Sequence, residues 1–344
     1  MSLLPDDKLD LMLLKNICTG RGLEINIAYL AREVGKHRRT VRNRINMLLS
    51  HGIIDRPIFP FKAVFNEYPL LVLSYSDLPF DDKTIDWLKK DENIFAAYRI
   101  REGESNTVIF EFHKDVWDYH LWREGITFDG KIPERGKRSP SHNSYFSNRS
   151  IFKYEPSIGI RLIEEEFAEK GKVEINNYTL DKDAVNILKC LVNGQGVRIN
   201  ENLLAKELGV SRKTILNKIA KFQQKGMILN ALCRFKHFFV PPNFLLILSM
   251  MEVKDSKKKV LQDISQDPHI SLGYHISEGR YNLLLFECHK SIEDYLLWED
   301  AYNEKYPGCL GSIKINILSP KMTILIDQQK VSLGLINAKL KSED

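Results

Sequence analysis

The chain lacks the marks of secreted and membrane-spanning proteins. Its five cysteines form no CxxC pair and are odd in number, which argues against a disulfide framework and indicates unpaired thiols in a reducing compartment. No apolar run approaches the roughly 20 residues that a membrane helix needs. The N-terminus meets acid within six residues and has no basic leader, so it does not resemble a signal peptide. We therefore expect a cytoplasmic protein with no membrane partner.

Motifs of common enzyme classes are missing as well. The chain has no Walker loop, GxSxG or HExxH motif, and its nine histidines are scattered. His113 and His289 each follow a glutamate by two residues, Glu111 and Glu287, and a repeated His/Glu pair is compatible with metal or acid–base chemistry. We expect instead an exposed strand end that recurs because the domain is duplicated. The sequence thus predicts no enzyme, no catalytic residue, no metal and no cofactor.

What the chain does have is the size and balance of a multidomain globular protein. It has 344 residues, of which 43% are hydrophobic and 28% are charged. That length exceeds one ordinary domain. The net charge of +5 is modest, so the position of the cations says more about partners than their excess.

The sequence also repeats itself in tandem. Residues 30–54 align without gaps on residues 204–228, with ten identities in 25 positions. The match resumes where residues 98–124 align on residues 274–300, with a shared His-Lys pair, a shared tyrosine and a shared tryptophan. This duplication predicts that each half of the chain holds the same two modules.

The first module of each copy predicts a winged helix-turn-helix. Ala31, Gly35 and Val41 have the spacing of a small residue that lets two helices approach, a turn glycine, and a branched residue that packs the second helix on the first. The second copy repeats all three positions. Second helices are predicted over residues 38–49 and 212–224, and the short extended segments that follow them suit a wing.

The outward face of each second helix carries cations. Residues 36–44 hold five cations and no acid, and arginine pairs well with phosphates and guanine edges. In the second copy Leu216 and Ala220 replace Arg42 and Asn46, so that copy is expected to contact mainly phosphates. The predicted partner is double-stranded DNA, and the predicted contacts are Arg38, Arg39, Thr40, Arg42, Asn43, Asn46, Ser211, Arg212, Lys213, Thr214, Asn217 and Lys218.

The second module of each copy alternates strand and helix. Apolar runs, helical periods and a half-buried alternating strand give the order βαββαβ, the ferredoxin-like split motif. In the first copy the last strand is predicted at 150–156, and the preceding stretch 126–150 is predicted to be a loop. The predicted fold class is α+β, with two winged helix-turn-helix domains alternating with two ferredoxin-like βαββαβ domains.

These modules predict a division of the whole chain. A short acidic helix is expected within the segment that joins the copies, and a packed segment with a charged end is expected at the C-terminus. The predicted parts are winged helix-turn-helix 1 at 1–62, effector domain 1 at 63–156, a linker at 157–180, winged helix-turn-helix 2 at 181–236, effector domain 2 at 237–330 and a tail at 331–344.

A winged helix-turn-helix followed by a βαββαβ domain resembles the Lrp/AsnC (feast/famine) transcription regulators of bacteria and archaea. The resemblance covers nearly the whole chain twice, and its most telling stretch is "SEGRYNLLLFEC" at 277–288, because these regulators carry a Gly-x-Tyr-Asp-like hairpin there. Asn282 stands where aspartate is usual. The resemblance implies a sequence-specific transcriptional regulator, with an amino acid or other small-molecule effector held near Gly103, Ser105, Asn106, Gly279, Tyr281 and Asn282.

Family members of this kind pair through the sheets of their effector domains. A fused pair therefore suggests that one chain is equivalent to one such dimer, with self-association inside the chain and in higher oligomers. Two alternatives stay open. Siroheme decarboxylases share the architecture, and some consist of two such units. The third interpretation is a ligand-sensing or assembly protein whose heads do not bind DNA.

Overall fold

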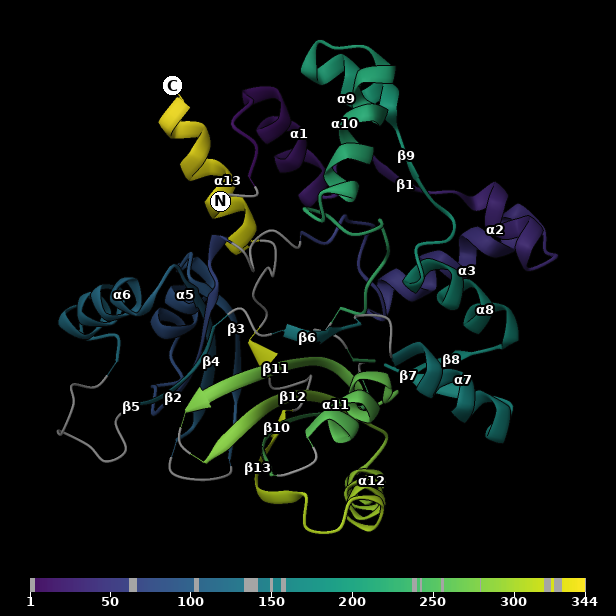
Figure 1. The fold of residues 1–344 in the computed structure, drawn as a ribbon. Helices are drawn as coiled ribbons and strands as arrows, with labels where there is room; N and C mark the ends of the chain where they lie inside the picture. The colour runs from purple at the N-terminus through teal and green to yellow at the C-terminus, as the bar shows by residue number, and fades with distance from the viewer. Residues whose placement is uncertain are drawn as a thin grey trace. The chain divides into compact units, whose positions relative to one another are not determined.

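The fold is that of a computed structural model, which describes most of the chain (Figure 1). No helix among the described residues is long and apolar enough to cross a membrane. The described residues are 4–61, 67–101, 105–132, 142–148, 151–155, 159–236, 240–241, 243–254, 257–278, 280–318, 323–324 and 330–343.

The chain forms two compact units, and each unit contains segments from both copies of the repeat. The first unit comprises residues 1–67, 163–236 and 329–344, and the second comprises residues 68–162 and 237–328. The order predicted from the repeat, helix-turn-helix followed by antiparallel βαββαβ sheet and then both again, is confirmed.

The first unit is mainly helical. Its second helices agree with the prediction to within one residue: α3 covers Arg38–Ser50 and α10 covers Arg212–Gln224. The segment that joins the copies contains helix α7 and a hairpin, and a 14-residue helix occupies the C-terminus. The other elements are α1 Lys8–Cys18, β1 Leu23–Ile25, α2 Ile27–Glu33, α7 Gly159–Lys170, β7 Val173–Ile175, β8 Tyr178–Leu180, α8 Lys182–Val192, β9 Val197–Ile199, α9 Glu201–Leu208 and α13 Lys330–Glu343.

The two helix-turn-helix domains of this unit, called heads below, exchange their first helices. Helix α1, from the first copy, contacts α9 of the second copy and α13, whereas α8, from the second copy, contacts α3 of the first (Figure 1). The apolar sides of both exchanged helices are fully buried, as at Leu14 and Leu188. Ion pairs follow the same exchange, because Asp10 of α1 binds Lys218 of α10 and Asp181 before α8 binds Arg44 of α3.

Two matched glycines permit the crossing. Strands β1 and β9 pair antiparallel where the chain passes between heads, with Glu24 opposite Arg198. A Cβ on Gly22 would lie 2.6 Å from Leu204, and one on Gly196 would lie 2.6 Å from Leu30. Both glycines also have positive φ, +75° and +77°, which disfavours any residue with a side chain.

The segments expected to form wings pair with each other. Ile54 bridges to Phe235, and Ile58 bridges to Leu232, both antiparallel. Ile54, Ile58 and Phe235 are less than one-tenth exposed, and Leu232 is half-buried. A further bridge joins Phe61 to Ile228.

The second unit holds two five-stranded antiparallel sheets. Their orders are β14-β3-β4-β2-β5 and β13-β10-β12-β11-β6. The elements of the first copy are β2 Leu70–Ser76, α5 Asp82–Lys90, β3 Ile94–Arg99, β4 Thr107–His113, α6 Val116–Phe128, β5 His142–Asn148 and β6 Ile151–Tyr154. Those of the second copy are β10 Leu245–Val253, α11 Lys257–Gln266, β11 Ile270–Glu278, β12 Tyr281–His289, α12 Ile292–Lys305, β13 Leu310–Leu318 and β14 Thr323–Ile324.

Edge strands are exchanged between these sheets. Strand β5 pairs with β2 and completes the sheet of the first copy. The prediction of a loop throughout 126–150 is therefore wrong over residues 142–148, and also over residues 126–128, which end helix α6. Strand β6, predicted to complete that same sheet, instead pairs with β11 of the second copy. In return β14 pairs with β3 of the first copy. Each exchange covers a strand edge that would otherwise present unpaired backbone groups.

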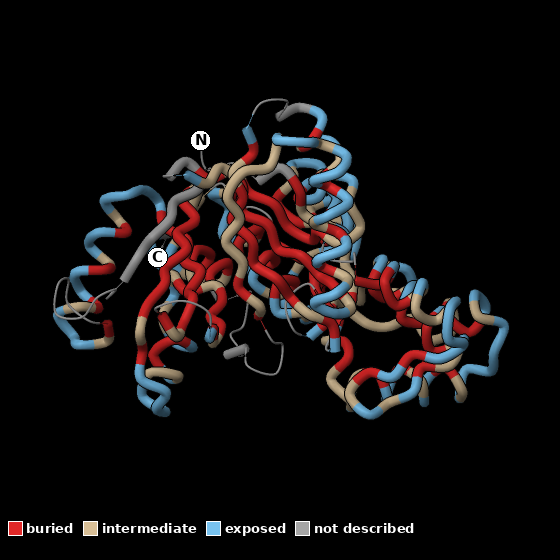
Figure 2. Tube along the Cα trace, turned by 90° about the horizontal axis from the view of Figure 1, so that it is seen from below, coloured by how far each residue is buried: buried red, intermediate tan, exposed pale blue. Residues whose placement is uncertain are grey.

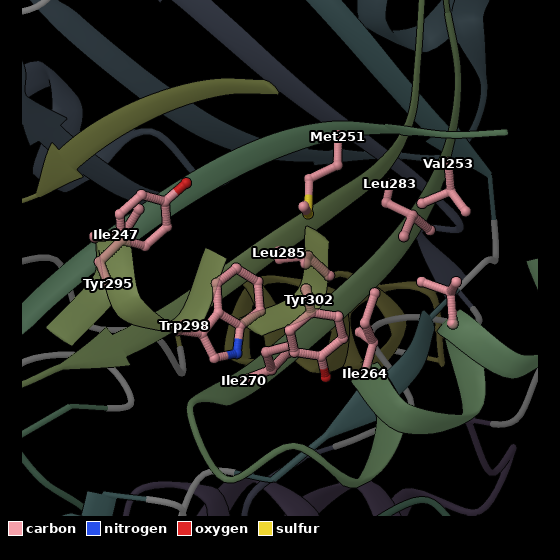
Figure 3. Close-up of a cluster of buried hydrophobic side chains, with 11 residues drawn as sticks. Ile247, Met251, Val253, Ile264, Ile270, Leu283, Leu285, Tyr295, Trp298 and Tyr302 are labelled. Carbon is pink, nitrogen blue, oxygen red and sulfur yellow. The ribbon is translucent and has the colours of Figure 1, made fainter. Parts of the chain in front are cut away.

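The inner strands of both sheets are buried along most of their length (Figure 2), and successive residues of a strand point to opposite faces. Phe110 of β4 meets Phe286 of β12 with ring centroids 4.9 Å apart, and Tyr75 donates a 2.7 Å hydrogen bond to Asn316, so one face of each sheet packs on the other sheet. The opposite face packs on the copy's own helices. In the second copy this core gathers Tyr295, Trp298 and neighbouring aliphatic side chains (Figure 3).

Candidate functional site: a basic helix face and two buried histidine clusters

The exposed side of α3 presents three arginines. Arg38, Arg39 and Arg42 are all exposed, while Val41 and Ile45 on the other side are buried. Among the residues that the structure describes, no ion pair involves any of these three arginines. Asn43 and Asn46 are exposed beside them and Thr40 is half-buried. Guanidinium and amide groups at three- and four-residue spacing on one helix can contact successive phosphates or base edges.

Two other cations of the same run have acidic partners. Arg44 pairs with Asp181 and Lys36 lies 3.2 Å from Asp183, both acids belonging to the second copy. The run has no acid of its own, but the helix exchange supplies two from α8 and the residue before it. These pairs leave the arginines at 38, 39 and 42 as the cations of α3 that face solvent without an acid.

The matching face of α10 is less suited to contact DNA, because some of its cations pair with acids of the protein. Lys218 pairs with Asp10, whose side chain is only 6% exposed, and Arg212 lies 3.4 Å from Glu201. Ser211 caps the helix by accepting from the Thr214 amide. Lys213 and Asn217 are exposed, beside Leu216, which is 39% exposed. Lys221 is exposed as well, so among the described residues α10 has two exposed cations without an acidic partner, against three on α3, and an apolar side chain lies at the centre of its face.

The predicted effector residues lie at matched hairpins. Asn106 accepts from the Leu78 amide and donates to the Leu78 carbonyl, each at 2.9 Å. Asn282 makes the same two bonds with Val253, at 2.9 and 2.7 Å. These amides hold each hairpin to the end of the neighbouring strand. Ser105 is buried and Tyr281 half-buried, whereas Gly103 and Gly279 lie outside the described residues.

The His/Glu pairs are not at exposed strand ends, so that expectation is wrong. Glu111, His113, Glu287 and His289 are all 0% exposed. They alternate with residues that face the other sheet and therefore lie beneath the helices, where His113 packs against Tyr119 with ring centroids 5.3 Å apart. When both faces of a strand are buried, a polar residue in it no longer indicates a solvent-facing position.

In the first copy the carboxylate is poorly solvated. Ser74 donates to Glu111 Oε2 at 3.2 Å, but Oε1 has no hydrogen-bond partner in the part of the chain that the structure describes. Burial raises the pKa of Glu111 to about 7. His113 Nε2 lies 3.8 Å from this carboxylate, and Asn93 Nδ2 contacts His113 Nδ1 at 3.4 Å.

The second copy is built differently around the same pair. Ser249 donates to Glu287, and His289 Nε2 lies 3.2 Å from that carboxylate. His269 occupies the place of Asn93 and stacks on His289, with centroids 4.8 Å apart. Burial pushes the pKa of Asp267 upward, but hydrogen bonds from His269 and Trp298 outweigh it and lower that pKa to about 2.

The sequence interpretation missed these neighbours. Asp118 and Asp294 sit at equivalent places in α6 and α12, and each accepts from the backbone at the preceding strand end. Asn93 and His269 follow an aspartate by two residues in both copies, Asp91 and Asp267. The alignment of the copies contained that signal, since His269 is a ligand-type residue that the first copy lacks.

Comparison with known proteins supports the helix-turn-helix and the tandem architecture. A family model described as "HTH domain" matches residues 185–233. No curated protein matches the chain. A solved structure of the siroheme decarboxylase NirDL matches over 98% of this chain and 99% of that chain, with a TM-score of 0.52 and 12% sequence identity. The fold is thus shared with that protein over its length.

Two further structures belong to the same comparison. NirDL in co-complex with an iron-uroporphyrin III analogue matches over 98% of this chain and 100% of that chain, again at 12% identity with a TM-score of 0.52. E. coli AsnC matches over 47% of this chain and 89% of that chain, at 18% identity with a TM-score of 0.30.

Proposed function

We propose that the protein is a DNA-binding transcriptional regulator in which α3 makes the sequence-dependent contacts. The observation that carries this proposal is the exposed face of Arg38, Arg39 and Arg42, with no acidic partner among the described residues. By contrast, Arg44 of α3 and Lys218 of α10 have acidic partners within the unit. Helix α10 then contributes contacts to phosphates, which position the protein without reading bases.

Fluorescence-anisotropy titrations against fragments of the source genome, at several salt concentrations, test this function. Replacing Arg38, Arg39 and Arg42 together with alanine is expected to weaken binding and to reduce the log–log salt slope by roughly 0.9 for each phosphate that the variant no longer neutralises. The matched control removes three exposed lysines of the same unit that lie outside both second helices: Lys170→Ala, Lys172→Ala and Lys341→Ala.

The outcomes separate clearly. A loss of affinity confined to the arginine variant, with an unchanged melting transition, supports contact through α3. Equal losses of affinity in both variants would indicate a response to net charge alone. Unchanged affinity in the arginine variant would contradict the proposal.

A second candidate function is enzymatic, namely decarboxylation of a tetrapyrrole. The full-length likeness to NirDL, which spans both copies, favours it more than it favours a regulator. That likeness carries the fold alone at 12% identity, and so this candidate ranks second. Titration with an iron tetrapyrrole, followed by its visible absorption band and by product analysis, tests it. Tight binding with loss of a carboxyl group, unaffected by the arginine substitutions, would replace the first proposal.

A further inference from the structure

Three ligand-type side chains from separate elements converge in the second copy. His269 lies just before β11, His289 ends β12, and Asp294 lies in the first turn of α12. One ligand atom from each lies within 4.8 Å of the others. His269 and Asp294 have side chains 21% and 31% exposed, so the cluster reaches the surface on one side.

The deepest member of the cluster has an unsatisfied ring nitrogen. His289 is 0% exposed, and its Nδ1 is buried without a hydrogen-bond partner among the described residues. The nearest acidic oxygen, Asp294 Oδ2, lies 3.6 Å away. In the first copy the equivalent nitrogen of His113 has the Asn93 amide at 3.4 Å. The unsatisfied ring nitrogen of His113 is instead Nε2, which lies 3.8 Å from Glu111. A buried polar atom without a partner costs stability, and in the second copy that atom is the one beside Asp294, where a bound ion would satisfy it.

Carboxylates orient both rings from behind. Asp267 Oδ1 lies 3.0 Å from His269 Nδ1, and Glu287 Oε2 lies 3.2 Å from His289 Nε2. A neutral imidazole carries one N–H and one lone pair, and the N–H goes to the carboxylate. The lone pairs are then on His269 Nε2 and His289 Nδ1. Histidines that bind metal ions in proteins are oriented by carboxylates in this way.

We propose that His269, His289 and Asp294 bind one divalent transition-metal ion of the zinc type. Two imidazoles and one carboxylate form a ligand set that suits such ions and leave a fourth position for water or another ligand. Asp294 Oδ2 also accepts from the Lys290 amide at 2.9 Å, and a carboxylate has lone pairs for both roles.

Binding requires one ring to turn. The two imidazole planes are 7° from parallel, and a ring-nitrogen lone pair lies in the plane of its ring. Parallel stacked rings therefore cannot both aim at one ion. His269 is the ring on the partly exposed side of the cluster, so rotation of His269 is the smaller rearrangement. That rotation gives up the contact between His269 Nδ1 and Asp267, so in the bound state only His289 keeps a carboxylate, Glu287, behind its ring.

The first copy supplies an internal control. Its equivalent residues are Asn93, His113 and Asp118, and they differ from the proposed ligands only at the first position. An amide is a poor ligand for zinc-type ions compared with imidazole. The proposal therefore predicts one ion for each chain, bound by the second copy.

Titration of the full-length protein with Co²⁺ under reducing conditions, with Zn²⁺ as competitor, tests the site. The natural sequence is expected to bind one Co²⁺ with visible d–d bands that Zn²⁺ removes. His269→Asn, which gives the second copy the residue of the first, is expected to abolish those bands. Asn93→His is expected to raise the stoichiometry to two. Circular dichroism checks that each variant folds.

Absence of the bands in the folded natural protein would overturn the proposal. Unchanged binding in His269→Asn would do the same, because the ion would then lie elsewhere. A stoichiometry that stays at one in Asn93→His would overturn the assignment of these three ligands as sufficient. Loss of the bands in the first variant together with a second ion in the other supports the site independently of DNA binding.

Discussion

Helices α3 and α10 occupy the same place in the repeat, and their buried sides are nearly interchangeable. Val41 and Ile45 of α3 correspond to Ile215 and Ile219 of α10, and all four are buried. Their outward sides differ, since Arg42 corresponds to Leu216. Packing constrains the inner residues of a duplicated head, whereas solvent leaves the outer ones free to change. The outward-facing positions at which α3 and α10 differ are therefore more informative about function than the buried positions that they share.

The largest expected effects come from breaking the helix exchange. Leu14→Ala in α1 and Leu188→Ala in α8 each remove a fully buried side chain at matched positions. Each substitution is expected to lower the free energy of unfolding by about 2–5 kcal/mol, measured by urea denaturation. Met12→Ala, at a side chain 40% exposed on α1, is the control and should change stability by less than about 0.5 kcal/mol. A small effect at one leucine alone would contradict a symmetric exchange.

The buried glutamates give a pH-dependent comparison. Burial raises the pKa of Glu111 from 4.5 to about 7, so between these values the folded state holds a proton that the unfolded state releases. Stability is therefore lost as the pH rises from about 4.5 to 7, by up to about 3 kcal/mol. Glu111→Gln is expected to remove this loss and to stabilise the protein at pH 8, as thermal melts across the pH range would show.

Glu287→Gln sharpens that comparison. Glu287 accepts from Ser249 and lies 3.2 Å from His289 Nε2, so its replacement removes good interactions. This variant is expected to be destabilised at pH 8, opposite in sign to Glu111→Gln. Stabilisation by both substitutions would show that the two sites are equivalent.

The two ion pairs that cross between heads are expected to contribute unequally to the stability of the protein. Lys218→Met leaves the Asp10 carboxylate, 6% exposed, without its cation and should cost about 2 kcal/mol. Arg44→Met breaks a pair with Asp181, 47% exposed, and should cost less than about 1 kcal/mol. Adding Asp10→Asn to Lys218→Met should recover part of the lost stability in chemical denaturation. No recovery would mean that the lysine acts by packing.

A reciprocal swap tests the outward faces with the smallest expected effect. Leu216→Arg adds a cation to α10, and Arg42→Leu removes its counterpart from α3. Each swap is expected to change DNA affinity by about 1 kcal/mol, with a change in salt slope of roughly 0.9 and opposite signs for the two variants. Anisotropy titrations measure both quantities. Equal weakening by both swaps would contradict the proposed division of roles.

The order of elements followed from periodicity and from the repeat, but their partners did not. Patterns in the sequence predicted the second helices and the βαββαβ order but neither α1 nor α8, and the apolar spacing of α1 does not say which helix covers it. Because both copies have the same spacing, the copy's own helices and those of the other copy satisfy the pattern equally well. The crossing depends on close approaches such as Gly22 to Leu204, which no local pattern reveals.

Two predictions are wrong because the polarity of the side chains did not reflect how the strands are placed. Strand β5, with the sequence HNSYFSN, lacks an apolar alternation, so it was predicted as loop although its backbone pairs fully with β2. Glu111 and His113 were predicted at an exposed strand end because charged residues in a strand normally face solvent. Backbone pairing and burial beneath helices can each override side-chain polarity. The DNA-contact residues remain predictions, because the structure shows where these side chains lie but nothing tests what they bind.

The exchange of α1 and α8 also means that helices near the N-terminus are synthesised long before the helices that pack against them. Helix α3 leaves the ribosome long before α8, because residues 51–181 separate them. At the usual rate of translation, that interval is on the order of ten seconds. During it the surface of α3 that α8 will cover, and the leucines of α1, must wait without their final partners. A chaperone that binds nascent chains would therefore find its longest-lived target in the first 50 residues.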